Sequence, residues 1–509
     1  MRQKSGHPLE SCIATRRLEE EWTAMTSVAS VAAQLPPISN ADEMCAPGFI
    51  QLPSHLDGFV QTDVPHESAR TEEFGTSTRR CQRRARILTV PGRLISKEAP
   101  SCPCCGKSME GNGQVPITLW HLPLGMERAR IEVSRRRWAC RECGQTSTEE
   151  VPFRAPGHRI TLPLLTFVQD LLALGQTLKA VSLMTGLHRN VVKEIDRARL
   201  EALYTEEGKD GERVLRKPER QARYLGIDEF KLHNGHKYAT VIIDLETGHV
   251  LWLACSKRKE VVYDFCDHVG EEWMSHVEAI ACDMNADFER AFLERFPHLD
   301  VVYDRFHLIK NFNEKVISEV RKDEQARLSK EGHAEAARSL KHSKYILMSG
   351  EDTRERKDQD ARAGKVVSKG SRLFGKEEAV QKGGARERYR ELISQNELLA
   401  ACDIVKEMLT RAYGYRQEKR MRDAMAQVVD TCRGTGDRHF EWFARLVEGH
   451  MDGIVAHARH RISSGKVEGT NQMIKTLRRA GYGYPDDEYF FLKIFDASRR
   501  YSKPSGAAA

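Results

Sequence analysis

The chain lacks any apolar run close to the roughly 20 residues that a bilayer-spanning helix needs. Its first residues, Met1 to Pro8, show no apolar core followed by a small-residue cleavage site, so no secretory signal peptide is predicted. A glycine-rich phosphate loop and a histidine-rich metal site are also missing, which argues against an oxidoreductase or hydrolase of small molecules. With 509 residues, 40% hydrophobic and 30% charged, we expect a soluble, cytoplasmic protein of several domains.

Few of the thirteen cysteines have ligand-like spacing, which favours a reducing compartment over a disulfide framework. The exceptions are two Cys-x-x-Cys knuckles, each followed by glycine, and they contain Cys102, Cys105, Cys140 and Cys143. Strand-like alternation between the knuckles predicts a hairpin, so the region 88–155 reads as a zinc ribbon with a structural zinc ion. A redox pair is the alternative, and Cys104 is a spare thiol that could replace a neighbouring ligand.

The net charge of +7 is only mildly basic, so the distribution of charge is more informative than its sum. Arginines cluster before each knuckle, at positions 79–86 and 135–137, and such clusters suit phosphate contacts. A solvated surface is an equally good explanation for either cluster alone. Residues 1–87 otherwise lack sustained periodicity and are predicted to form an irregular N-terminal extension.

The region 160–206 reads as helices, with a turn at Thr185-Gly186-Leu187 between the last two. This spacing suits a helix-turn-helix whose second helix begins near His188. Its first turns would offer to a DNA groove the side chains of His188, Arg189, Asn190 and Lys193. An ordinary helical hairpin is the alternative, and the preceding zinc ribbon favours DNA binding.

From residue 220 the pattern switches to strands. Three strands with hairpin turns span 223–256, and helices then alternate with strands up to 303. This order predicts a multidomain α/β protein with an RNase H-like catalytic domain in which the first and fourth strands are neighbours. We expect its first part at 220–312, a mostly helical insertion at 313–454, its second part at 455–500, and a tail at 501–509. The charged, glycine-containing stretch 353–388 is expected to be a mobile centre of the insertion.

Three acidic residues form the most informative pattern. Asp228 and Asp283 follow apolar runs that read as buried strands, and Glu468 lies in a predicted helix. A carboxylate at the end of a buried strand is costly unless a cation or hydrogen bonds compensate it. Such a set suits two-metal phosphoryl transfer, with Asp228 bridging two magnesium or manganese ions and the other acids each holding one.

Other polar residues near these acids have two explanations each. Glu229, Asp244, Asp287 and Asp304 could be catalytic, but any of them alone is better explained as a cap, salt-bridge or surface residue. His307 follows the last strand and could lie beside the carboxylates or simply begin a helix. On the Glu468 helix, Gln472, Lys475 and Arg479 recur on one face, which suits a bound phosphodiester.

Taken together, these motifs resemble bacterial insertion-sequence DDE transposases of the IS-L-three type over about residues 88–500. The resemblance rests on the four cysteines, the helix-turn-helix, Gly-Ile-Asp228-Glu-Phe, Cys-Asp283-Met, Tyr-Asp304-Arg-Phe-His307 and Lys-Val-Glu468-Gly-Thr-Asn-Gln-Met-Ile-Lys475. It implies the catalytic triad Asp228, Asp283 and Glu468, with Asp304, His307 and Lys475 in supporting roles. Some related enzymes carry an arginine four residues before the glutamate, where this chain has Ser464.

The resemblance implies binding of double-stranded DNA at terminal inverted repeats, followed by strand cleavage and transfer. At least a dimer is expected, because two DNA ends must be brought together. Two rival functions stay open: a catalytically inactive or repurposed zinc-ribbon and helix-turn-helix DNA-binding protein, and a nuclease or resolvase without strand transfer.

Overall fold

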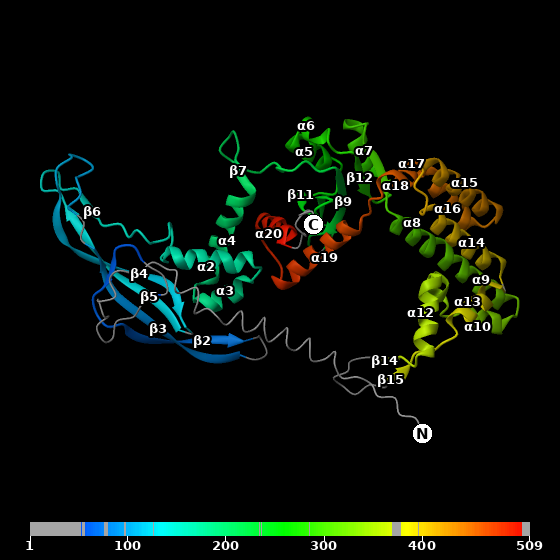
Figure 1. The fold of residues 1–509 in the computed structure, drawn as a ribbon, viewed down its shortest axis with the longest axis horizontal. Coiled ribbons are helices and arrows are strands. Elements are labelled where there is room, and N and C mark those ends of the chain that lie inside the picture. Colours follow the sequence, from blue (N-terminus) through cyan, green and yellow to red (C-terminus); the bar gives the residue numbers. More distant parts are fainter. Residues whose placement is uncertain are drawn as a thin grey trace, which may run out of the picture. The chain divides into compact units, whose positions relative to one another are not determined.

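The protein consists of two compact units, Met1–Phe167 and Val168–Ala509 (Figure 1). The structure is a computed structural model. It describes residues 52, 56–75, 80–95, 98–125, 127–233, 235, 237–284, 286–368, 378–394 and 396–500. Within these ranges, no helix is long and apolar enough to cross a membrane.

The first unit contains a six-stranded sheet, drawn in blue to cyan in Figure 1. Its strands are β1 (Phe59–Gln61), β2 (His66–Gly75), β3 (Arg80–Leu94), β4 (Glu110–Leu124), β5 (Glu127–Ala139) and β6 (Thr146–Thr148). The order is β1-β3-β5-β4, with β2 also paired to β3 and β6 to β5. The predicted hairpin between the knuckles is confirmed as the antiparallel pair β4 and β5.

One face of this sheet forms the core of the unit, as the alternation along β5 predicts. Ala129, Ile131 and Val133 are fully buried, and they alternate with half-buried polar residues. Val90 of β3 and Leu119 of β4 join the same apolar cluster. The opposite face carries polar side chains of β5 such as Arg130 and Glu132, together with the buried Ala85 and Ile87 of β3.

The prediction of irregular structure throughout residues 1–87 is wrong for β1, β2 and the first half of β3. β2 is mostly polar, so its sequence gives no period-two signal of burial. It is held instead by antiparallel pairing with β3, which in turn pairs in parallel with β5 about forty residues further along the chain. Residues 1–51 of this predicted extension lie outside the described residues.

Three helices come next in the chain, and the first of them begins within the first unit. α2 (Leu162–Ala173) leads into α3 (Leu178–Thr185) and α4 (Arg189–Tyr204), close to the predicted positions. The Thr177 side chain accepts a hydrogen bond from the Ala180 backbone at the start of α3. Gly186 ends α3 with a φ of 79°, a left-handed conformation that glycine adopts without steric cost. Two short paired strands follow, β7 (Thr205–Glu207) and β8 (Arg213–Leu215).

A five-stranded sheet lies at the centre of the second unit, in the order β11-β10-β9-β12-β13. Its strands are β9 (Tyr224–Lys231), β10 (Tyr238–Asp244), β11 (Val250–Ala254), β12 (Ala279–Cys282) and β13 (Asp300–Tyr303). The first three are antiparallel, and β12 runs parallel to both β9 and β13. The predicted adjacency of the first and fourth strands is therefore confirmed.

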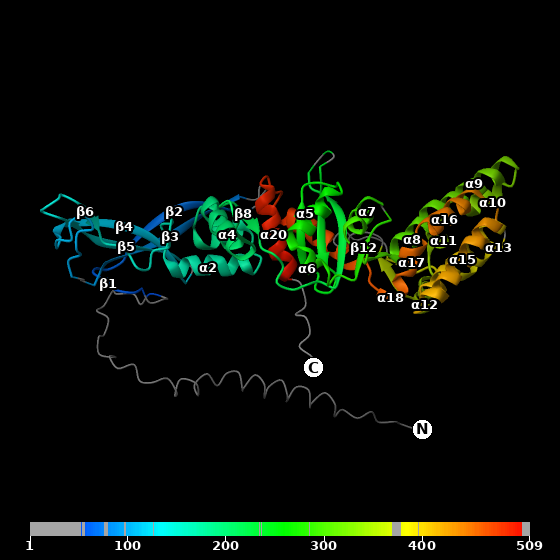
Figure 2. The same ribbon diagram turned by 90° about the horizontal axis from the view of Figure 1, so that it is seen from above.

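Helices cover both faces of this sheet. On one face lie α5 (Glu260–Val269), α6 (Glu271–Met274) and α7 (Ala286–Arg295), which join a large apolar cluster with the insertion. On the other face, α19 (Gly465–Ala480) and α20 (Asp487–Arg500) contribute Val467, Ile474 and Ile494 to a second cluster. α20 also contacts α4 and β11, so it links α4 to the sheet (Figure 2).

The insertion is helical, as predicted. It begins with a continuous helical run of α8 (Arg305–Asn311), the π-helical turn η3 (Phe312–Ile317) and α9 (Ser318–Lys330). The helices that follow are α10 (Ala334–Leu340), α11 (Lys344–Met348), α12 (Glu351–Arg362), α13 (Ala385–Ser394), α14 (Glu397–Ala412), α15 (Glu418–Gly434), α16 (Arg438–Gly449), α17 (Met451–Val455) and α18 (His457–His460). They gather beside the sheet in both views (Figures 1 and 2).

Much of the stretch 353–388, the expected mobile centre of the insertion, has regular secondary structure. α12 occupies its first part, and β14 (Val366–Ser368) pairs with β15 (Glu378–Val380). The Asp358 carboxylate accepts hydrogen bonds from the backbone amides of Ala385 and Arg386, which ties α12 to the start of α13. Residues 369–377 lie outside the described ranges.

Candidate zinc and catalytic sites

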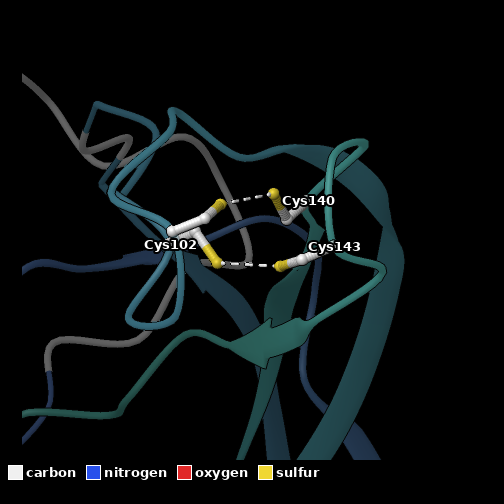
Figure 3. A group of neighbouring side chains, drawn as sticks. Cys102, Cys140 and Cys143 are labelled. Atoms are coloured by element: carbon white, nitrogen blue, oxygen red, sulfur yellow. Dashed lines mark hydrogen bonds between the residues drawn. The ribbon is translucent and has the colours of Figure 1, made fainter.

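The four predicted zinc ligands lie together at one end of the first unit's sheet. Cys102 and Cys105 precede β4, and Cys140 and Cys143 follow β5, so the hairpin brings the knuckles together. The Sγ atoms are 3.5 Å apart for Cys102 and Cys143, and 3.4 Å apart for Cys105 and Cys140 (Figure 3). All four lie within 4.8 Å of one another.

The backbone around the thiols also fits a tetrahedral zinc site. Gly106 and Gly144 have φ angles of 72° and 70°, and their amides donate to the carbonyls of Cys102 and Cys140. Hydrogen bonds from the backbones of Cys105 and Cys104 lower the pKa of the Cys102 thiol to about 7, whereas hydrogen bonds among the neighbouring thiols raise the pKa of Cys105 and Cys143. Cys104 itself is exposed and outside the group. The donor set therefore supports a structural zinc ion held by the four predicted cysteines.

The three predicted catalytic acids line one cavity of about 290 Å³ in the second unit. Asp228 lies in β9, Asp283 follows β12 directly, and Glu468 lies in the first turn of α19. Parallel pairing of β9 with β12 explains why the two aspartates share one end of the sheet although 55 residues separate them. Lys310 and Lys475 line the same cavity.

Close packing of α19 on β9 positions the glutamate. A Cβ atom at Gly226 would lie 2.5 Å from Cγ2 of Val467 and 2.7 Å from Cδ2 of Leu245. Only glycine therefore allows the helix to lie this close to the strand. Gly226 precedes Asp228 by two residues, and Val467 precedes Glu468 by one, so this contact sets how the two acids face each other.

Asp228 is half-buried and accepts two hydrogen bonds. The Glu229 amide donates to Oδ1 at 2.7 Å, and the Asn471 side chain donates to Oδ2 at 2.7 Å. Burial, aided by the nearby charge of Asp283, raises the pKa of Asp228 even though these hydrogen bonds oppose the shift. A bound cation would relieve that cost. The Oδ1 atom of Asn471 is buried without a hydrogen-bond partner beside this carboxylate.

Asp283 pairs with His307. Nδ1 of His307 lies 3.0 Å from Oδ1 of Asp283, and this hydrogen bond lowers the pKa of the aspartate. The same contact raises the pKa of His307, against the effect of burial. The structure thus brings His307 to the carboxylates, one of the two positions that the sequence left open.

Asp304 caps α8 and also holds the start of α19. Its carboxylate is 6% exposed and accepts hydrogen bonds from the amide of Phe306 at 2.8 Å and the amide of Ser464 at 2.7 Å. The Ser464 hydroxyl also donates to it. Ser464 therefore connects α19 to the residue that follows β13.

The oxygen donors of the cavity fit hard divalent cations such as magnesium. Among the described residues, only the cysteine group has three or more ligand atoms within 4.8 Å of one another, so the acids line the cavity at longer range. Asn471 was missed by the sequence reasoning. Its position one helical turn after Glu468 was an available signal.

The other candidate acids differ in their surroundings. Asp244 accepts hydrogen bonds from the Glu246 amide at 2.7 Å and the Thr247 hydroxyl at 2.8 Å, so it stabilises the turn after β10. Asp287 is exposed in the first turn of α7. Glu229 lines the cavity, and burial raises its pKa.

The four predicted DNA-contact residues lie at the start of α4. His188 caps the helix, its Nδ1 accepting a hydrogen bond from the Asn190 amide at 3.3 Å, and Arg189 and Asn190 are exposed. Lys193 is engaged differently. Its Nζ lies 2.9 Å from the Asp486 carboxylate and 5.2 Å from the ring centre of Tyr489.

A buried ion network that was not predicted from the sequence joins α4 to α20. Asp196 is fully buried and accepts hydrogen bonds from Tyr489 at 2.6 Å, Lys493 at 2.8 Å and Arg199 at 2.9 Å. Burial alone would raise the pKa of Asp196, but the two cations and the tyrosine hydroxyl hold it below its usual value. Arg199 also contacts Asp496 at 3.2 Å.

Comparisons with known proteins agree with this geometry. Residues 225–494 match the family model for ISL3-type sequences, described as "Transposase". Residues 98–143 match the model of the zinc-finger of transposase IS204/IS1001/IS1096/IS1165. The first match spans both parts of the sheet domain and the insertion between them, and the second contains all four cysteines of the zinc group.

Individual relatives carry the same description. The chain is 29% identical to the transposase for insertion sequence element IS1001 of Bordetella parapertussis over 412 residues, 79% of this chain and 91% of that protein. It is 27% identical to the transposase for insertion sequence element IS1557 of Mycobacterium tuberculosis over 286 residues, 52% of this chain and 57% of that protein. The chain therefore belongs to the ISL3 family of transposases, enzymes that cut and join DNA.

Proposed function

We propose that this transposase binds the terminal inverted repeats of its insertion sequence and cleaves and transfers strands at a site built on Asp228, Asp283 and Glu468. What supports the proposal is the convergence of three carboxylates from separate chain segments on one cavity that also contains Lys310 and Lys475. The three acids would hold two magnesium or manganese ions. When bound, such ions lower the pKa of an attacking water and stabilise charge on the leaving oxygen.

The chain's own residues orient the reacting groups. Asn471 fixes the Asp228 carboxylate, and His307 fixes that of Asp283, so both acids enter the reaction with their directions set. Lys475 is exposed in the cavity seven residues after Glu468, where its ammonium group is available to a phosphodiester. Asp304 acts as a positioning residue, because it holds α19 through Ser464.

Two successive reactions use this site. Hydrolysis frees a 3′-hydroxyl at the end of the element, and that hydroxyl then attacks a phosphodiester of the target DNA in line. Neither reaction needs a covalent protein intermediate, so no nucleophilic side chain is required. Because two element ends must be joined to one target, the active form is at least a dimer.

Recognition of the ends is assigned to the start of α4. Arg189 and Asn190 are exposed in its first turn, the part of a recognition helix that reaches base edges. His188 orders that turn through its cap. Lys193 contributes by holding α4 to Asp486 while its charge remains near the same surface.

The test is cleavage of DNA that carries the gene's own flanking ends, in magnesium, comparing wild type with Glu468→Gln. The matched control is Asp264→Asn, an exposed carboxylate on α5 outside the cavity. We expect cutting at the ends by wild type and the control, and loss of cutting with retained end binding in Glu468→Gln. Binding without cutting by all three proteins would instead identify a catalytically inactive DNA-binding protein, and cutting by Glu468→Gln would refute the assigned site.

A further inference from the structure

The polar face of the first unit's sheet carries a group of arginines to which no role has been given. We define the arginine face as the side of this sheet that bears Arg70 of β2, Arg93 of β3, Arg130 of β5 and Trp120 of β4. Ile131 and Val90 of the unit's core point to the other side, whereas Ala85 and Ile87 of β3 are buried apolar residues on the same side as the arginines.

Strand register brings these side chains to one side of the sheet. Arg130 is paired with Thr89 on β3 and with Trp120 on β4, and its guanidinium lies 3.9 Å from the centre of the indole ring. Arg93, four residues after Thr89, is on the same side of β3. Burial lowers the pKa of Arg130, and the nearby charge of Arg70 adds to this shift.

Charge on this face is unbalanced. The acidic residues on this side of the described strands are Glu72 of β2 and Glu132 of β5, and no side chain that the structure describes forms an ion pair with Arg70, Arg93 or Arg130. Arg86, on β3 but on the opposite side, shows the contrast. It pairs with Glu67 at 2.5 Å and with Glu127 at 3.1 Å, as expected of an arginine that stabilises the sheet.

Arginines that lie together without carboxylates repel one another unless an anion joins them. Guanidinium groups donate in a planar fork that matches phosphate oxygens, and stacking on Trp120 fixes the direction of one fork. The chain acts on DNA, whose backbone supplies a row of phosphates. Because its charges are spread over several strands, this sheet face is better suited to bind a row of phosphates than to bind a single small anion.

We propose that the arginine face binds the phosphate backbone of duplex DNA without reading its sequence. It is a contact surface distinct from the start of α4, so it adds affinity that is equal for every sequence, while α4 selects the ends. The proposal rests on the chain being a DNA transposase and is independent of which residues carry the cleavage site.

Binding of the full chain to two fluorescent duplexes would test this, one with the element's end and one of random sequence, measured across a range of salt concentrations. The variant is Arg70→Gln/Arg93→Gln, since both side chains are exposed and neither stacks on Trp120. Each lost phosphate contact reduces the slope of log K against log salt by about 0.9, so we expect a reduction of about 2 on both duplexes.

The control is Arg86→Gln, which removes a paired arginine of the same sheet and should leave the salt slope unchanged. Melting curves of all variants establish that the zinc-bearing unit stays folded. A double variant with the wild-type slope on both duplexes would overturn the proposal and leave the face to another partner, such as an acidic protein. A loss confined to the end-bearing duplex would also overturn it, because the face would then be reading sequence.

Discussion

The buried ion network between α4 and α20 gives the sharpest stability prediction. Asp196→Asn keeps the shape of the side chain but removes the charge that faces Lys493, whose side chain is only 7% exposed. Arg199 keeps its second partner, Asp496, so the main cost is one buried ammonium without a counter-charge. Breaking a buried pair from one side costs about 3–5 kcal/mol, and we expect about 3 kcal/mol here because Arg199 remains paired.

Thermal and urea unfolding would measure this cost, with a fall in melting temperature of roughly 5–10 °C. Asp267→Asn is the matched control, because Asp267 pairs with Arg295 at the surface and should contribute less than about 1 kcal/mol. Adding Lys493→Met to Asp196→Asn should recover part of the loss. If Asp196→Asn behaved like the control, or if the two substitutions were additive, the network would not stabilise the link between α4 and α20.

Three further predictions concern pH, packing and metal. The folded state lowers the pKa of Asp196, so the charged carboxylate should contribute its full stabilisation above about pH 4 and lose it as the pH falls through the pKa of the folded state. The free energies of unfolding of wild type and Asp196→Asn should therefore converge below that pH. Gly226→Ala should lower the free energy of unfolding by about 1–3 kcal/mol and reduce DNA cleavage at least about tenfold, because the added methyl group displaces α19. Adding Val467→Ala should restore part of the stability and part of the activity. Unchanged cleavage by Gly226→Ala would contradict the packing argument. Cys105→Ser should lose the zinc found by metal analysis while Cys104→Ser keeps it, and equal zinc in both would exclude Cys105 as a ligand.

The sequence predicted best what depends on short-range pattern. Knuckle spacing identified Cys102 and Cys140 with their partners, and apolar runs located β9, which contains Asp228, and β12, which ends just before Asp283. It failed for β2, because a polar strand held by pairing with β3 has no period of its own. It also left Asp244 and His307 with two explanations each. A polar residue in a turn or at a helix start cannot be told from one in a catalytic cavity until its neighbours in space are known.

By itself, the sequence determined the order of the elements and the chemistry available at each, because periodicity and residue type are local properties. The tertiary structure decided which of those residues meet. Parallel pairing of β9 with β12, and the approach of α19 that Gly226 permits, bring three acids to one cavity from positions 240 residues apart. It also assigned Lys193 and Asp196 to the contact with α20 rather than to solvent. Such contacts depend on long-range packing, in which a side chain's partner is set by the fold and not by its neighbours in sequence.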